Sequence, residues 1–185
     1  YDSQRDLRPG EAVFVDLQHN VSTKKLSDKP HRPCIFEHVY FARPDSFLDD
    51  VSVYKSRIRM GESLAAKWID SGLQADVVIP VPESARISAL SMAKELDIPY
   101  REGFVKNRYV GRTFIMPRGS SRRDEVRHKL NTIPLEFENQ KVLLVDDSIV
   151  RGNTSKQLVE IARKAGAEKV YLASCSPPLR FPCPY

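Results

Sequence analysis

The hydrophobic positions of this chain follow one period near its start and another from residue 51 onward. Residues 11–27 alternate apolar and polar side chains around a polar turn at 18–20, which predicts a β-hairpin. A polar linker, residues 27–33, precedes an aromatic-rich run that ends before Pro44 and predicts a strand. Residues 1–33 therefore form either part of a different domain or an addition at the edge of the main fold.

From residue 51 onward, helix and strand patterns alternate. The helix predicted over 51–71 has an apolar face made of Val51, Tyr54, Ile58, Ala65 and Trp68. The next helix has a stripe made of Ala85, Ala89, Met92 and Leu96. Strands are expected at 75–82, 100–106, 141–145 and 169–176, and a further helix at 155–167. This alternation predicts an α/β fold in which helices flank a central, mainly parallel sheet.

Composition sets limits on this picture. The chain has 185 residues, 41% of them hydrophobic and 29% charged, which suits one α/β domain with a small appendage. No apolar run approaches the roughly 18 residues of a membrane span, and the first residues do not resemble a signal peptide. The cysteines Cys34, Cys175 and Cys183 form no C-x-x-C pair, which argues against a secreted disulfide framework and favours a cytoplasmic protein.

The net charge of +5 is concentrated in one segment. Residues 106–129 hold eight Lys or Arg side chains against Asp124 and Glu125, so the rest of the chain is close to neutral. A basic surplus this dense favours an anionic partner, either a polyphosphate metabolite or nucleic acid, although a solvated surface loop explains a basic stretch equally well. Glycines in the segment would let it close over a polyphosphate and exclude water.

Candidate chemistry follows the strand at 141–145. Asp146 and Asp147 end this strand, and a stretch with Gly152 and several hydroxyl side chains then opens a helix. Backbone N–H groups at a helix start can bind phosphate, whereas the carboxylates must serve sugar hydroxyls or a divalent cation. A diol and a phosphate on one short loop describe a ribose 5-phosphate.

A second loop at a strand end carries a weaker signal. Pro80 and Pro82 make the strand end rigid, and Glu83-Ser84-Ala85 then opens a helix. Backbone N–H groups and a hydroxyl suit a second anion such as pyrophosphate, but a helix capping box explains the same residues equally well.

Four motifs, taken in their order along the chain, resemble those of the type I phosphoribosyltransferases. VLLVDDSIVRGNTS resembles their phosphoribosyl pyrophosphate (PRPP) motif. With HVYFARPDS, VPES and KNRYVGRTFI, the similarity is closest to the glutamine PRPP amidotransferase family and runs from about Pro33 to Tyr185. The resemblance implies a type I phosphoribosyltransferase fold at 34–185, incomplete at its C-terminal end. RDLRPGEAVFVD is similar to the end of that family's glutaminase domain, of the Ntn hydrolase type, so residues 1–33 would be a remnant of it or an edge hairpin.

The resemblance also implies roles for the matching positions. Asp146 and Asp147 would hold the ribose hydroxyls and, with Ser84, a Mg²⁺ ion. The PRPP-binding residues would be Ser84, Asp146, Asp147, Ser148, Arg151, Gly152, Asn153, Thr154 and Ser155. The flexible loop that closes over the substrate would begin with Lys106, Asn107, Arg108, Tyr109, Val110, Gly111, Arg112 and Thr113. The catalytic residues would be Asp146, Asp147, Lys106, Arg108 and Tyr109.

By the same resemblance, the chain would form 5-phosphoribosylamine and pyrophosphate from PRPP and ammonia, the first committed step of purine synthesis. It would be a cytoplasmic homo-oligomer that binds AMP and GMP as inhibitors, without a membrane or nucleic acid partner. The family takes ammonia from glutamine with an N-terminal cysteine on a preceding domain. This chain begins with Tyr1 and lacks that domain, so glutaminase activity is not expected from it.

Two cysteines raise the question of a cluster. Cys34 and Cys183 coincide with two of the four positions that ligate a [4Fe–4S] cluster in some members of the family. A cluster normally takes four thiolates, and the other two positions would lie beyond Tyr185. The resemblance therefore leaves cluster binding open, beside the simpler interpretation of buried or incidental cysteines.

Two other functions stay open at this level. A salvage phosphoribosyltransferase would need a hood that binds a free base, which residues 1–33 could form. A non-catalytic regulator that senses PRPP or purines would need a DNA-reading element such as a helix-turn-helix, and the sequence shows no convincing one.

Overall fold

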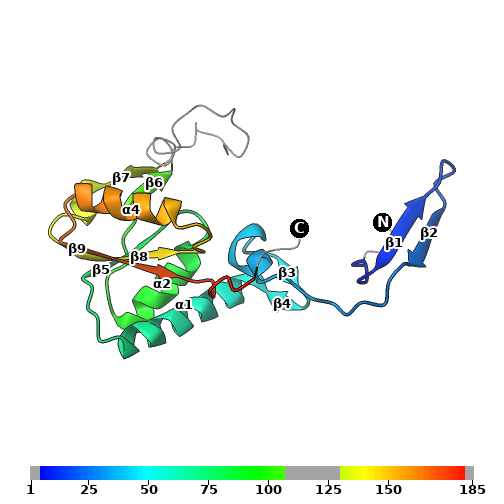
Figure 1. The fold of residues 1–185 in the computed structure, drawn as a ribbon, viewed down its shortest axis with the longest axis horizontal. Coiled ribbons are helices and arrows are strands. Elements are labelled where there is room, and N and C mark those ends of the chain that lie inside the picture. The colour runs from blue at the N-terminus through cyan, green and yellow to red at the C-terminus, as the bar shows by residue number, and fades with distance from the viewer. Residues whose placement is uncertain (1–4, 107–129, 182–185) are drawn as a thin grey trace. The chain divides into compact units, whose positions relative to one another are not determined.

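The chain forms two compact units, Tyr1–Cys34 and Ile35–Tyr185, and the computed structural model describes residues 5–106 and 130–181 (Figure 1). In the first unit, β1 (Glu11–Val15) pairs antiparallel with β2 (Val21–Lys25). Asp16 shapes the turn, because its Oδ1 accepts the backbone N–H groups of Gln18 and Asn20 at 2.9 and 2.8 Å. The predicted hairpin is confirmed, while its origin in a glutaminase domain stays a prediction.

The second unit is built around a parallel sheet with the strand order β5 (Val77–Pro80), β8 (Lys141–Asp146) and β9 (Lys169–Ser174). Tyr100 adds a parallel bridge to Val78 of β5. The antiparallel pair β6 (Phe104–Lys106) and β7 (Leu130–Thr132) follows in the chain. The short remaining elements are β3 (Phe47–Leu48), β4 (Val51–Ser52) and the 3-10 turn η2 (Pro134–Glu136). The predicted α/β fold around a parallel sheet is confirmed.

Helices cover both faces of the sheet. One face carries α4 (Asn153–Lys164), and the other carries α1 (Val53–Asp70) and α2 (Arg86–Leu96) (Figure 1). In β8, Val142 and Leu144 pack in the core beneath α4, whereas Leu143 and Val145 pack in the core with α1 and α2. Alternate side chains of a strand point to opposite faces, so this unbroken apolar run needs a layer on each side. None of the helices described in residues 5–106 and 130–181 is long and apolar enough to cross a membrane.

The first helix begins close to where the sequence predicts, but its buried face only partly matches the predicted one. Ser52 caps α1, because its side chain accepts the N–H of Lys55 at 3.3 Å. The buried residues of α1 are Val53, Arg57, Gly61 and Ala65. Val51 and Tyr54, which the pattern places on the apolar face, are 43% and 49% exposed. The prediction is confirmed for Ala65 and for Trp68, which packs against the core, but it misses the buried arginine and glycine because neither counts as an apolar position.

The buried arginine also explains an error in the strand prediction. The run before Pro44 forms a π-helical turn, η1 (Glu37–Phe41), and not the predicted strand. Arg57 donates from Nε to the carbonyl oxygen of His38 and from Nη2 to that of Ala42, both at 2.9 Å. Buried carbonyl groups need such donors, so a side chain distant in the sequence satisfies the turn and stabilises it.

Candidate functional site

Two loops leave the sheet at the same edge. Because β5, β8 and β9 run parallel and in register, their last residues lie side by side. The hydrogen-bonded ladder continues past β9, where backbone N–H groups donate to the carbonyl oxygens of Asp146 and Asp147 at 3.0 and 2.9 Å. Loops 81–85 and 147–152 therefore start from neighbouring strand ends, which is where open α/β sheets bind ligands.

Asp147 connects these two loops. Its Oδ2 accepts a hydrogen bond from the Ser84 hydroxyl of loop 81–85, and its Oδ1 accepts one from the Ser148 hydroxyl at 2.6 Å. Ser84 and Asp147 are 63 positions apart in the sequence. The fold thus brings Ser84, which is predicted to bind pyrophosphate, into contact with Asp147, which is predicted to bind ribose and a metal ion.

Asp146 is the more deeply buried member of the acidic pair, with 7% of its surface exposed. Its Oδ1 accepts the backbone N–H of Asp147 at 2.9 Å. Burial, followed by the charge of Asp147, raises the pKa of the Asp146 carboxyl to about 7, while the N–H bond opposes the shift. Two carboxyl groups in this arrangement are stabilised by hydroxyl donors or by a cation.

The loop after the acidic pair turns directly into α4. Gly152, at the helix boundary, has a φ of +74°, and a Cβ there would meet nothing within 4 Å. The first N–H groups of an α-helix have no partners within the helix. In α4, no side chain among the described residues caps them either. Arg151, Asn153 and Thr154 are exposed beside them, whereas Ser155 is buried. An uncapped helix start behind a glycine suits a phosphate group.

A groove of about 720 Å³ lies next to the acidic loop. One wall is the outer side of α1, and the other is the segment that follows β9, with Ile149 contributed by loop 147–152. Its lining combines serine hydroxyls with Arg59, Lys67 and apolar side chains, and it includes no carboxylate. The surroundings of the acidic pair on this side are therefore open and carry positive charge.

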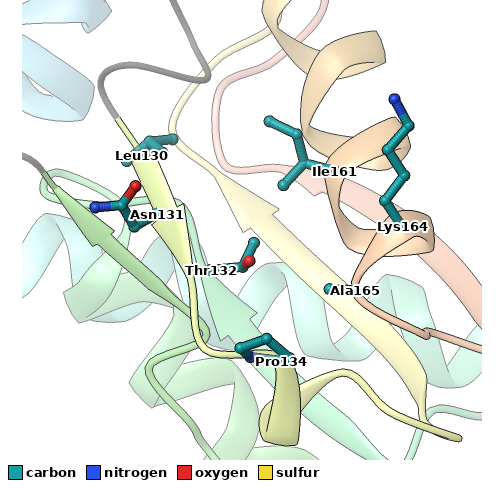
Figure 2. A pocket seen from close by; sticks show the side chains of 7 residues that line it. All are labelled: Leu130, Asn131, Thr132, Pro134, Ile161, Lys164 and Ala165. Carbon is teal, nitrogen blue, oxygen red and sulfur yellow. The ribbon is translucent and has the colours of Figure 1, made fainter.

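A second cavity, of about 340 Å³, lies between β7 and the C-terminal half of α4 (Figure 2). The figure shows that the Asn131 amide points away from α4 and that the Lys164 ammonium extends along the helix, away from Thr132. Ligand sites usually have polar groups that converge, which these do not. The helix rise places Asn153, at the other end of α4, about 12 Å from Ile161 in the cavity lining, so this cavity is separate from the acidic site.

The other predicted site residues are only partly described. Lys106, the first residue of the predicted flexible loop, ends β6. Cys34 is exposed. The remaining predicted residues lie outside the described residues: Asn107, Arg108, Tyr109, Val110, Gly111, Arg112, Thr113 and Cys183.

The described loops fall within a recognised domain. A family model for the phosphoribosyl transferase domain matches residues 52–175, a range that contains both loops and the acidic pair. The chain therefore belongs to the phosphoribosyl transferase domain family, and its type I phosphoribosyltransferase fold is confirmed by the solved structures that it resembles.

Within that family, the chain is similar to amidophosphoribosyltransferases. It is 55% identical to the Escherichia coli K12 enzyme, over 100% of this chain and 37% of the relative, and 50% identical to the Schizosaccharomyces pombe enzyme, over 100% and 38%. It also matches, at 40% identity and a TM-score of 0.77, a solved glutamine PRPP amidotransferase from B. subtilis complexed with ADP and GMP, covering 97% of this chain and 39% of that one. The predicted resemblance is confirmed, and the chain spans less than two-fifths of the length of these relatives.

Proposed function

We propose that this chain is the phosphoribosyltransferase part of an amidophosphoribosyltransferase, which forms 5-phosphoribosylamine and pyrophosphate from PRPP and ammonia. The observation that carries the proposal is the contact between Ser84 and Asp147, because it joins the loop predicted for pyrophosphate to the loop predicted for ribose 5-phosphate. The names of the relatives support this reaction over a salvage transferase or a non-catalytic regulator.

In the proposed reaction, the bond between ribose C1 and the pyrophosphate oxygen breaks, and the ammonia nitrogen bonds to C1 from the opposite face and then loses a proton. Asp146 and Asp147 would accept hydrogen bonds from the ribose hydroxyls. The N–H groups at the start of α4, reached past Gly152, would bind the 5-phosphate. With Ser84 at the pyrophosphate, the substrate would be anchored on both sides of C1, which favours the reactive geometry.

The exposed side chains around α4 extend this phosphate site. Arg151, Asn153 and Thr154 would reach the 5-phosphate from the solvent side, whereas the buried Ser155 would contribute its backbone N–H more readily than its hydroxyl. The basic residues predicted for the flexible loop, beginning with Lys106, would stabilise the charge that develops on the leaving pyrophosphate.

The residues at the acidic site fit a Mg²⁺ ion. Proteins usually hold Mg²⁺ through one or two carboxylates together with substrate phosphates. Asp146 and Asp147 supply two carboxylates and Ser84 a hydroxyl, while the described residues contain no group of three or more His, Cys, Asp or Glu that could hold a metal alone. When bound with PRPP, the ion would neutralise negative charge on the pyrophosphate.

An iron–sulfur cluster stays a prediction, because Cys183, one of its two predicted ligands, lies outside the described residues. A [4Fe–4S] cluster needs four thiolates. Cys34 is exposed, and burial raises the pKa of the Cys175 thiol to about 11, which disfavours its thiolate. With Cys183 outside the described residues, no step of the proposed reaction involves a cluster.

The wider assignments rest on the relatives. The B. subtilis enzyme is complexed with ADP and GMP, which supports purine nucleotide binding by this chain, and we propose that AMP and GMP act as its inhibitors. Ammonia would come from glutamine through a glutaminase domain, of which residues 1–33 would be a remnant preceding a transferase domain at 34–185. We place the protein in the cytoplasm as a homo-oligomer that has no membrane or nucleic acid partner.

Asp147→Asn tests the proposed site. The variant keeps the shape of the side chain but removes the charge that would accept the ribose hydroxyls and attract Mg²⁺. Loss of charge-assisted hydrogen bonds to the ligand predicts at least a 100-fold weaker PRPP affinity by titration calorimetry with Mg²⁺. Asp45→Asn is the matched control, since Asp45 pairs with Arg43 at 2.8 Å outside the site. Undiminished PRPP binding by Asp147→Asn would contradict the proposed PRPP site.

Turnover separates the proposed reaction from its alternatives. PRPP consumption that depends on ammonia supports the amidotransferase chemistry. Consumption that depends instead on adenine, guanine, hypoxanthine or orotate indicates a salvage enzyme, and salt-dependent DNA affinity without turnover indicates a regulator.

A further inference from the structure

A partly exposed arginine contacts both the loop that the proposed function assigns to pyrophosphate and the segment that leads to the predicted flexible loop. Arg86, the first residue of α2, is two positions after Ser84. Its Nη1 contacts Glu83 Oε2 at 2.7 Å, and its Nε lies 3.2 Å from Glu102 Oε1. One guanidinium therefore contacts both loop 81–85 and the segment that leads into β6, the strand that ends at Lys106.

Glu102 is also held in place by Tyr100. The Tyr100 hydroxyl donates to the same Oε1 atom at 2.6 Å, and the Tyr100 backbone bridges to Val78 in the central sheet. The guanidinium of Arg86 is thus directed toward Glu83 by a carboxylate that is itself anchored to the sheet.

These ion pairs contribute little to folding stability. The Arg86 side chain is 41% exposed, and those of Glu83 and Glu102 are 54% and 40% exposed. Ion pairs with this exposure are weakened by solvent and by salt. The arrangement therefore calls for an explanation other than stability.

We propose that Arg86 is a positioning residue that cancels the charge of Glu83 and so keeps loop 81–85 receptive to a pyrophosphate group. The inference rests on the proposed function. Glu83 directly precedes Ser84, so an unpaired carboxylate there would repel the most highly charged part of PRPP. Paired with Arg86, the loop presents its hydroxyl and backbone N–H groups without that repulsion.

The test compares charge-changing variants of the 185-residue chain by calorimetric titration with PRPP and with inorganic pyrophosphate, both with Mg²⁺. Arg86→Gln leaves Glu83 unpaired, and we expect both ligands to bind about tenfold more weakly at low ionic strength. Glu83→Gln/Arg86→Gln restores neutrality, and most of the lost affinity should return. Arg101→Gln is the matched control, because Arg101 lies next to Glu102 but pairs with Glu136 at 3.6 Å.

Salt and thermal unfolding exclude a purely structural effect. The Arg86→Gln deficit should shrink several-fold between about 0.05 M and 0.5 M salt, since solvent-exposed charges are screened over this range. The midpoint of thermal unfolding should change no more than in Arg101→Gln. A larger fall in that midpoint, with a deficit that salt does not change, would overturn the proposal in favour of a structural role.

The binding data distinguish the possible failures. If the wild-type chain binds PRPP and Arg86→Gln binds equally well, the role of Arg86 is wrong and the proposed function stands. If the double variant stays as weak as Arg86→Gln, Arg86 does not act by cancelling Glu83, and the proposal fails. If the wild-type chain binds neither PRPP nor pyrophosphate, the proposed function fails and the role of Arg86 fails with it.

Discussion

Loop 147–152 holds most of what its proposed role requires within its own sequence, whereas loop 81–85 depends on residues from other elements. In and just before the first loop, two of the bonds that orient the acidic pair join adjacent residues: the Asp147 N–H donates to Asp146 and the Ser148 hydroxyl donates to Asp147, while the third comes from Ser84. Gly152 then turns the chain into α4. The contacts between adjacent residues follow from residue types at fixed spacing.

Loop 81–85 is positioned by contacts with other elements of the fold. The N–H of Val81 donates to the carbonyl oxygen of Val145 in β8 at 2.8 Å, and Ser84 reaches Asp147 beyond the end of that strand. The helix that follows the loop is held by α1, because the Ser88 hydroxyl donates to the Arg57 carbonyl oxygen at 2.8 Å. A local motif can thus be recognised from sequence, while a loop built from distant contacts gives only a weak signal.

The largest effect is expected where α1 supports the helix after loop 81–85. An added Cβ at Gly61 would lie 2.3 Å from the Ser88 carbonyl oxygen and 2.8 Å from Ser91 Cβ, so the two helices would have to separate. Gly61→Ala should lower the free energy of unfolding by about 2 kcal/mol, even after the gain in helix propensity. That loss corresponds to a fall of roughly 4–8 °C in the midpoint of thermal unfolding.

Glu62→Ala is the control for this prediction, because Glu62 is exposed on the same helix. Its free energy of unfolding should stay within about 0.5 kcal/mol of the wild-type value. Gly61→Ala should also weaken PRPP binding through loop 81–85. Unchanged stability in Gly61→Ala would show that α1 does not constrain α2, which would remove the distinction between the two loops.

The same distinction explains how far the sequence could predict the molecule. The alternation of apolar runs predicts the parallel sheet and the helices on both faces, because a strand buried on two sides must be apolar throughout. The PRPP motif predicts roles for Asp146, Asp147 and Gly152, because the proposed roles depend on spacing along one short stretch of chain. For these elements, local pattern and tertiary structure agree.

Other features could not be predicted because distant contacts decide them. An arginine in a helix is normally assigned to the solvent face, and hydrogen bonds to the carbonyl groups of His38 and Ala42 help to make the burial of Arg57 favourable. The same hydrogen bonds stabilise η1 in the aromatic-rich run for which the sequence pattern predicts a strand. The contact of Arg86 with Glu102 could not be predicted for a similar reason, since these residues become neighbours only in the fold, although its other partner Glu83 is three positions away.

A smaller effect is expected from removing the hydroxyl that joins the two loops. Ser84→Ala deletes the hydrogen bond to Asp147 and the hydroxyl predicted to face pyrophosphate. A hydrogen bond to a charged group contributes about 1.5 kcal/mol, so PRPP affinity should fall about tenfold in calorimetric titrations. Ser91→Ala is the control, because the Ser91 hydroxyl also bonds to another helix, at the Ile58 carbonyl oxygen, but lies outside the loop.

If Ser84→Ala and Ser91→Ala changed PRPP affinity equally, the effect would come from α2 packing in general. The contact between the two loops would then have no specific part in binding. A deficit confined to Ser84→Ala would instead show that loop 81–85 binds ligand through its connection to Asp147.

The smallest effect concerns the boundary of loop 147–152 with α4. Gly152 has a φ of +74° with open space around it, so Gly152→Ala adds backbone strain without a steric clash. The left-handed conformation costs an alanine about 1 kcal/mol, which should appear as a fall of a few degrees in the midpoint of thermal unfolding. Gly72→Ala should lose the same stability, because Gly72 has a φ of +67° and also meets nothing within 4 Å.

Binding separates these two glycines. Strain at Gly72 lies at the end of α1 and should leave PRPP affinity unchanged. Strain at Gly152 displaces the N–H groups at the start of α4, so affinity for PRPP should fall several-fold in Gly152→Ala alone. Equal affinities in both variants, despite equal losses of stability, would mean that the phosphate site does not depend on the backbone at Gly152. Loop 147–152 would then owe its function to the acidic pair and not to the glycine turn that makes its motif recognisable.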